Sequence, residues 1–298
     1  LGVYLNFKNE QFTYKDAEPI KSAYSTGLGE VRLAFGANNE LLAIRKITLK
    51  SINNYIKDDI SKDFNRYLTV QNTLKKEIVN IKGVFFQETN SVNIIFEGFI
   101  QCSLREYLYS FLSGEKHLNS SSKKLSIVIG IAAAMEKLHS LSEPCYHGHL
   151  NASNIFLIND RVKIGDILFT NLKKYCGITI GYFNKTKYTA PELLSEGITN
   201  FRAVLEGRED VYSFGMIVWE LFNEKEPFAN MKTKEWIKLV VEESLRPKID
   251  ENNIDPDLAH IIRLCWQSDR EKRPTFVQLL SLLRNFQTKL EQEEDSSG

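Results

Sequence analysis

Residues 210–221 have the sequence DVYSFGMIVWEL, in which an acidic start leads into a long apolar run. The spacing of the apolar residues predicts a helix over residues 208–222. Three further motifs flank this stretch: TAPE at 189–192, CW at 265–266 and RPT at 273–275. Because proline favours the first turn of a helix, the last motif predicts that a helix begins there and covers residues 275–290.

The chain changes character near residue 100. Before that point, short apolar runs alternate with turn signals, which indicates an antiparallel meander. The expected strands there are residues 20–24, 31–35, 41–47, 84–87 and 92–96, with one helix over 63–81. Beyond it the periodicity is helical, and the expected helices are residues 103–112, 121–141, 208–222 and 275–290. This order predicts an α+β fold with a small sheet-rich lobe and a larger helical lobe.

Composition excludes several classes of protein. Lys and Arg together number 38 and so do Asp and Glu, so no basic excess points to a nucleic-acid partner. No segment reaches the roughly 18 apolar residues that a membrane helix needs. The four cysteines lie far apart without a CxxC motif, which indicates a reducing compartment, and we expect the cytoplasm.

Taken in order, the motifs resemble the C-terminal lobe of a protein kinase of the tyrosine-kinase-like branch. The resemblance implies a bilobal kinase fold, with an antiparallel sheet and helix C in the N-lobe and a helical C-lobe. The expected domain limits are a leader at 1–15, an N-lobe at 16–100, a C-lobe at 101–290 and an acidic tail at 291–298. It also implies that Glu192 pairs with Arg273 and that Asp210 caps the backbone of the catalytic loop.

The catalytic positions of this family are mostly changed. Where the family has H-R-D-L-x-x-x-N, residues 147–154 have HGHLNASN. His149 replaces the aspartate that would accept a proton, and Gly148 replaces the arginine that would hold a phosphorylated segment. The resemblance therefore leaves His149 as a degenerate catalytic position, and Asn154 and Asp166 as the expected oxygen ligands of Mg²⁺.

The nucleotide positions are partly kept. Arg45 replaces the lysine of the third strand, and a guanidinium is not equivalent to an ammonium at a phosphate. Lys46 cannot replace it, because strand alternation points Lys46 to the opposite face. Glu77 is expected on helix C as a partner of Arg45. The resemblance places the following residues around ATP: Gly27, Gly29, Val31, Ala43, Arg45, Glu77, Phe96, Glu97, Phe99 and Phe156.

The glycine-rich loop keeps little of its pattern. Gly29 occupies a motif position and Gly27 is displaced by one, so an ordinary hairpin turn and a phosphate cradle both fit this segment.

These changes lead to the prediction of a pseudokinase, a non-enzyme that serves as a signalling scaffold or allosteric switch for a protein partner, with weak ATP binding and a site that could hold Mg²⁺. The loop at 147–154 is similar to those of mixed-lineage kinase-like proteins, which are necroptosis effectors, of Janus-kinase pseudokinase domains and of plant receptor-like pseudokinases. Two alternatives are open: a low-activity atypical protein kinase that uses ATP and Mg²⁺, and a binding module that needs no nucleotide.

Overall fold

The computed structural model describes residues 13–14, 30–35, 41–87, 90–97, 102–110, 120–158, 161–167, 169, 172, 175, 186–194, 205–251 and 253–297. Contacts divide the chain into two compact units. The first unit contains Leu1–Tyr107 and Ala152–Ile180, and the second contains Leu108–Asn151 and Gly181–Gly298. The domain limits expected from the sequence stay a prediction.

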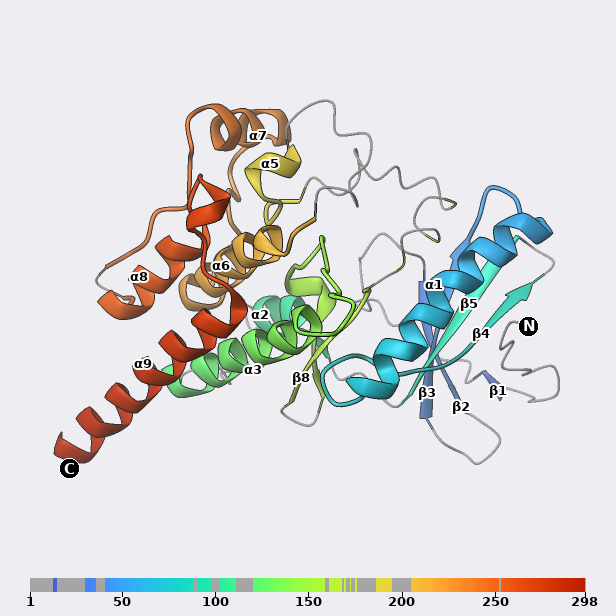
Figure 1. Cartoon of the computed structure of the whole chain (residues 1–298), viewed down its shortest axis with the longest axis horizontal. Coiled ribbons are helices and arrows are strands. Elements are labelled where there is room, and N and C mark those ends of the chain that lie inside the picture. Colours follow the sequence, from blue (N-terminus) through green and yellow to red (C-terminus); the bar gives the residue numbers. More distant parts are fainter. Residues whose placement is uncertain are drawn as a thin grey trace. The chain divides into compact units, whose positions relative to one another are not determined.

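The first unit is built on a five-stranded antiparallel sheet (Figure 1). Its strands are β1 (Thr13–Tyr14), β2 (Glu30–Phe35), β3 (Leu41–Thr48), β4 (Ile81–Gln87) and β5 (Ser91–Glu97), in the order β1-β2-β3-β5-β4. The expected strands at 31–35, 41–47, 84–87 and 92–96 are confirmed within these limits, while the one at 20–24 lies outside the described residues. The central strand β3 therefore has β2 on one side and β5 on the other.

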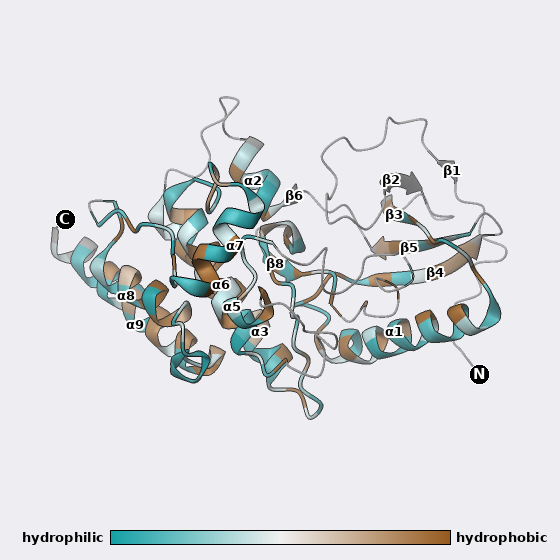
Figure 2. Cartoon of the chain, turned by 90° about the horizontal axis from the view of Figure 1, so that it is seen from above, coloured by the Kyte–Doolittle hydropathy of each residue, from teal (hydrophilic) through white to brown (hydrophobic). Residues whose placement is uncertain are grey.

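Helix α1 (Asn54–Thr73) belongs to this unit, and the expected limits of 63–81 are wrong. The helix begins early because the side chain of Asn53 accepts a hydrogen bond from Ile56 N at 2.9 Å, which caps the first turn. Figure 2 shows apolar and polar residues alternating along α1. The apolar residues buried at helical spacing are Ile56, Ile60, Phe64, Tyr67 and Val70.

A second, three-stranded antiparallel sheet completes the first unit. It consists of β6 (Cys102–Ser103), β7 (Ile155–Ile158) and β8 (Arg161–Ile164). Two backbone bonds tie β8 to the segment after α1: Ile164 N donates to Glu77 O at 2.8 Å, and Val79 N donates to Ile164 O at 2.9 Å. The short helix α2 (Leu104–Ser110) follows β6 directly.

The second unit is helical. Its helices are α3 (Ser121–His139), α5 (Pro191–Leu194), α6 (Arg208–Asn223), α7 (Thr233–Glu242), α8 (Pro256–Cys265) and α9 (Phe276–Ser297), with the 3₁₀ turn η5 (Arg270–Lys272). Helix α6 lies in the interior: every residue from Glu209 to Leu221 is buried. It packs on α8 and α3, and α3 packs along α9 (Figure 1). Helix α9 continues as far as Ser297, into the segment expected as an acidic tail.

The antiparallel sheet of the first unit and the helical second unit confirm the expected α+β class. Within the part of the chain that the structure describes, no helix is long and apolar enough to cross a membrane.

Candidate active site

A buried ion pair lies at the centre of the first unit. Nη1 of Arg45 on β3 is 2.6 Å from Oδ1 of Asp166, and each side chain is only 3% exposed. Asp166 directly follows the β7–β8 hairpin and has a φ of +57°, in the left-handed region that aspartate tolerates better than most residues. Lys46 is exposed, as strand alternation predicts. The Arg45 guanidinium therefore forms an ion pair with Asp166, one of the two residues expected to bind Mg²⁺.

The expected placement of Glu77 on helix C is wrong. Helix α1 ends at Thr73, and Glu77 lies in the irregular segment after it, where its carbonyl accepts the bond from Ile164. The contact that the structure shows for Arg45 is with Asp166 instead. Sequence analysis missed this pair, because Arg45 and Asp166 are 121 positions apart and no local pattern links them.

The two expected metal ligands are neighbours. Asn154 closes the 3₁₀ turn η3 (Ala152–Asn154) and is fully buried, and its carbonyl accepts a hydrogen bond from Gly165 N at 2.8 Å. Because Gly165 precedes Asp166, this bond brings the two ligand positions to one end of the β7–β8 hairpin. The side-chain atoms Oδ1 of Asn154 and Oδ2 of Asp166 are both buried.

This donor set fits magnesium. Mg²⁺ in nucleotide sites is usually held by one or two protein oxygens together with substrate phosphates and water. Among the described residues, no group of three His, Cys, Asp or Glu side chains could hold a metal by itself. Asn154 and Asp166 would therefore share the ion with a phosphate-bearing ligand.

Apolar residues lie beside the ion pair in the same sheet. Ala43 on β3 is the register partner of Phe96 on β5, and both are buried. The Arg45 guanidinium lies 5.4 Å from the centre of the Phe96 ring, a cation–π distance. The backbone of Val31 on β2 faces that of Arg45. Three of the residues expected around ATP therefore lie near the position of Arg45: Ala43 on the same strand, Val31 on β2 and Phe96 on β5.

Phe156 on β7 is also buried, as expected for a residue beneath a base. An added Cβ on Gly165 would come within 2.4 Å of its ring atom Cε2, so the packing of Phe156 requires glycine next to Asp166. Glu97 ends β5, and its backbone pairs with Leu42. The remaining expected nucleotide contacts, Gly27, Gly29 and Phe99, lie outside the described residues.

The second unit holds the loop that contains His149. Asp210, which is buried on α6, accepts bonds from Gly148 N to Oδ1 and from His147 N to Oδ2, both at 2.8 Å. Nε2 of His139 lies 2.9 Å from the same Oδ2. These bonds confirm that Asp210 caps the loop.

His149 itself is half-buried. Its backbone N donates to Nδ1 of His147 at 3.2 Å, and its carbonyl accepts a bond from Nδ2 of Asn151 at 2.9 Å. Both the backbone N–H and the carbonyl of His149 are therefore hydrogen-bonded within this loop.

Asp210 makes stability depend on pH. Burial alone would raise its pKa, but the hydrogen bond and charge of His139 and the charge and backbone N–H of His147 outweigh burial and lower the pKa. A carboxyl group with a lowered pKa in the folded state stabilises the fold above its unfolded pKa of about 3.9, and that contribution is lost as the pH falls below it.

We therefore expect the free energy of unfolding to decrease as the pH falls from about 5 to about 3, and Asp210→Asn to flatten this dependence. Urea unfolding at a series of pH values measures it. Asp58→Asn, at an exposed carboxylate of α1, is the control. Equal slopes for the wild type and Asp210→Asn would contradict the prediction.

A second ion pair anchors the C-terminal part of the chain. Arg273 donates from Nη1 to Oε1 of Glu192 at 2.5 Å and from Nη2 to Oε2 at 2.9 Å, which confirms the expected bidentate pair. Arg273 is 1% exposed and also donates to the carbonyls of Gln267 and Arg208. Because Glu192 is in the first turn of α5 and Arg273 precedes α9, the pair joins two distant parts of the chain.

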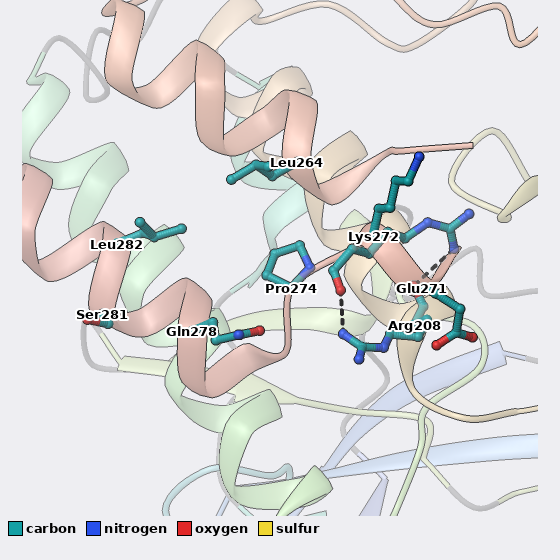
Figure 3. A pocket seen from close by; sticks show the side chains of 9 residues that line it. Arg208, Leu264, Glu271, Lys272, Pro274, Gln278, Ser281 and Leu282 are labelled. Atoms are coloured by element: carbon teal, nitrogen blue, oxygen red, sulfur yellow. Dashed lines mark hydrogen bonds between the residues drawn. The ribbon is translucent and has the colours of Figure 1, made fainter. Parts of the chain in front are cut away.

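A surface pocket of about 540 Å³ lies next to this anchor. Figure 3 shows Gln278, Ser281 and Leu282 from α9 on one side and Arg208, whose guanidinium donates to the carbonyl of Arg273, on another. None of the residues expected at the catalytic or nucleotide site lines this pocket.

Comparison with known proteins gives a family match. The model described as "Protein tyrosine and serine/threonine kinase" matches residues 26–283. The chain is 28% identical to "Probable serine/threonine-protein kinase roco5" of Dictyostelium discoideum over 92% of its own length, which is 10% of that protein. It is 32% identical to "Serine/threonine/tyrosine-protein kinase HT1" of Arabidopsis thaliana over 65% of its own length, which is 47% of that protein.

A third relative is "Serine/threonine-protein kinase CTR1" of Arabidopsis thaliana, 29% identical over 74% of the chain and 26% of that protein. The chain thus spans about half or less of the length of these relatives. All three are named as kinases, so the prediction of a pseudokinase and of a non-enzyme is wrong. The narrower resemblance to mixed-lineage kinase-like proteins, with its link to necroptosis, stays a prediction.

A kinase domain generally binds ATP and Mg²⁺. The motifs at residues 147–154, 189–192, 210–221 and 273–275 carry the loop cap and the Glu192–Arg273 anchor described above. With the match over residues 26–283, they show that the chain belongs to the protein tyrosine and serine/threonine kinase family.

Proposed function

We propose that this chain is an atypical, slow protein kinase that transfers the γ-phosphoryl group of ATP to a hydroxyl side chain of a protein. The observation that carries the proposal is the buried site formed by Arg45, Asp166 and Asn154 in one compact unit. Phosphoryl transfer depends mostly on positioning and on charge stabilisation, and these residues supply a fixed cation and two metal-ligating oxygens. The names of the relatives support the same activity.

In this proposal the adenine lies against the β2–β3–β5 part of the sheet. Asn154 and Asp166 hold Mg²⁺, which when bound neutralises charge on the phosphates. The proposed nucleotide contacts are Gly27, Gly29, Val31, Ala43, Arg45, Phe96, Glu97, Phe99 and Phe156. Glu77 is left out of this set, because it follows α1 rather than lying on it.

His149 is the proposed proton acceptor. Histidine is the commonest general base in enzymes, and a free imidazole titrates near pH 6.5, so a neutral ring can take the proton of a substrate hydroxyl. An imidazole lacks the negative charge of the usual aspartate and occupies more space. A misplaced or weaker base costs up to about 10²–10⁴-fold in rate, which explains why we expect slow turnover.

The substrate is proposed to be a cytoplasmic signalling protein. The even charge balance gives no sign of a nucleic-acid substrate, and a hydroxyl acceptor on a protein agrees with the names of the relatives.

Single-turnover labelling from radioactive ATP and Mg²⁺, with peptides that contain Ser, Thr and Tyr, tests the proposal. We expect measurable labelling by the wild type, a gain of about tenfold or more in His149→Asp and a loss of similar size in His149→Ala. The control His260→Ala, at an exposed histidine of α8, should leave the rate unchanged. A wild type that labels no peptide would refute the proposed function. A labelling rate that His149→Ala leaves unaltered would refute the role of His149 as the base.

A further inference from the structure

Arg45 and Asp166 cancel each other's charge inside the proposed ATP site. The two side chains are 2.6 Å apart, and at 3% exposure each is almost completely removed from water. Asn154, the other oxygen donor beside them, is a neutral amide. The charge of the Asp166 carboxylate is therefore balanced by the guanidinium in contact with it.

This neutrality matters for a ligand that carries several negative charges. A buried carboxylate without a counter-ion repels the phosphates of ATP, and the repulsion is strong where little water screens it. In a site of that kind a divalent cation must bind between carboxylate and phosphates before the nucleotide can bind tightly. Here a guanidinium already neutralises the carboxylate.

The cation is fixed in place by the fold rather than recruited from solution. Arg45 is in the middle of β3, with register partners Val31 on β2 and Ile94 on β5, and its guanidinium lies 5.4 Å from the Phe96 ring centre. On the other side, Asp166 is held by the left-handed turn after β8. Because both partners are held before any ligand arrives, the pair forms without the entropy cost of ordering flexible side chains.

We infer that Arg45 is a built-in counter-ion for Asp166, so that this chain binds ATP without a divalent cation. The inference rests on the proposed function for the identity of the nucleotide. It separates two roles that a metal usually combines: nucleotide binding proceeds with Arg45 alone, and Mg²⁺ is required for the transfer step. Mg²⁺ must then share Asp166 with a cation already bound to it.

Titration with the fluorescent nucleotide mant-ATP, in EDTA and in Mg²⁺, tests the inference on the full chain. For the wild type we expect the two dissociation constants to agree within about threefold. For Arg45→Met, which leaves Asp166 without this counter-ion, we expect binding in EDTA to weaken by about tenfold or more and Mg²⁺ to restore most of it. Lys46→Met, at the exposed next position of β3, is the matched control and should behave as the wild type.

The double variant Arg45→Met/Asp166→Asn guards against a folding defect, because it removes both buried charges together. It should bind mant-ATP equally in EDTA and in Mg²⁺. Wild-type binding that is about tenfold or more tighter in Mg²⁺, or absent in both conditions, would overturn the inference. The inference would also be overturned if the Arg45→Met variant is folded but its binding of mant-ATP depends on Mg²⁺ no more than that of the wild type.

The mant-ATP titration and the peptide-labelling assay test the two proposals independently. Metal-independent mant-ATP binding without peptide labelling would refute only the phosphotransfer activity. Peptide labelling together with strictly Mg²⁺-dependent binding would refute only the role of Arg45.

Discussion

Replacing Asp166 with asparagine is expected to lower peptide labelling in Mg²⁺ by about 10³-fold or more. The substitution keeps the size of the side chain but removes the charge that holds the metal in the transfer step. It also leaves the buried guanidinium of Arg45, now 2.6 Å from a neutral amide, without its counter-charge. The expected loss comes from the metal, because the metal held by this carboxylate would stabilise the charge that spreads over the oxygens of the transferring phosphoryl group.

The measurement is the single-turnover labelling of peptide, with thermal unfolding recorded alongside to confirm that the variant is folded. Asp58→Asn, an exposed carboxylate in the same unit, is the control and should label at the wild-type rate. An Asp166→Asn variant that keeps the wild-type rate would show that the metal is held elsewhere and would contradict the assignment of this site.

Arg273→Met is expected to lower the free energy of unfolding by about 3–5 kcal/mol. The change removes both bonds to the Glu192 carboxylate and leaves that charge in a largely buried place, with its side chain only 21% exposed. It also removes the donors to the carbonyls of Gln267 and Arg208, and the guanidinium that lies 5.2 Å from the Tyr212 ring centre.

Urea unfolding measures this effect. The control is Arg263→Met, which breaks the exposed pair of Arg263 and Glu251 and should cost less than about 1 kcal/mol. The double variant Glu192→Leu/Arg273→Met should recover part of the loss, because it removes the stranded carboxylate along with its partner. A loss in Arg273→Met no larger than in Arg263→Met would show that the anchor adds little to stability.

The clearest disagreement between sequence and structure concerns helix α1. The sequence pattern predicted a helix over 63–81, but the helix covers Asn54–Thr73. Ile56 and Ile60 continue the apolar spacing backwards into a polar stretch, and the Asn53 cap completes the signal. Because the helix ends at Thr73, Glu77, which was expected to pair with Arg45 from helix C, lies beyond the helix.

The functional interpretation was wrong for a different reason. His149 and Arg45 were taken as losses that end catalysis, whereas two proteins that are similar to this chain over most of its length are named as kinases. How much a substitution in the active site lowers the rate of phosphoryl transfer depends on the residues around it. Histidine can accept a proton, and arginine keeps the positive charge of the residue it replaces.

The order of the motifs around residues 210–221 was sufficient to predict the family, the α+β class and the two long-range anchors made by Asp210 and by Arg273. The fold class follows from local periodicity, whereas the two anchors are what the resemblance to the family implied. The partner of Arg45 could be found only in the folded chain, because β3 and the end of β8 are 121 positions apart and no local pattern links them. Tertiary packing alone brings the guanidinium to Asp166, and it buries the contact so that each side chain is only 3% exposed.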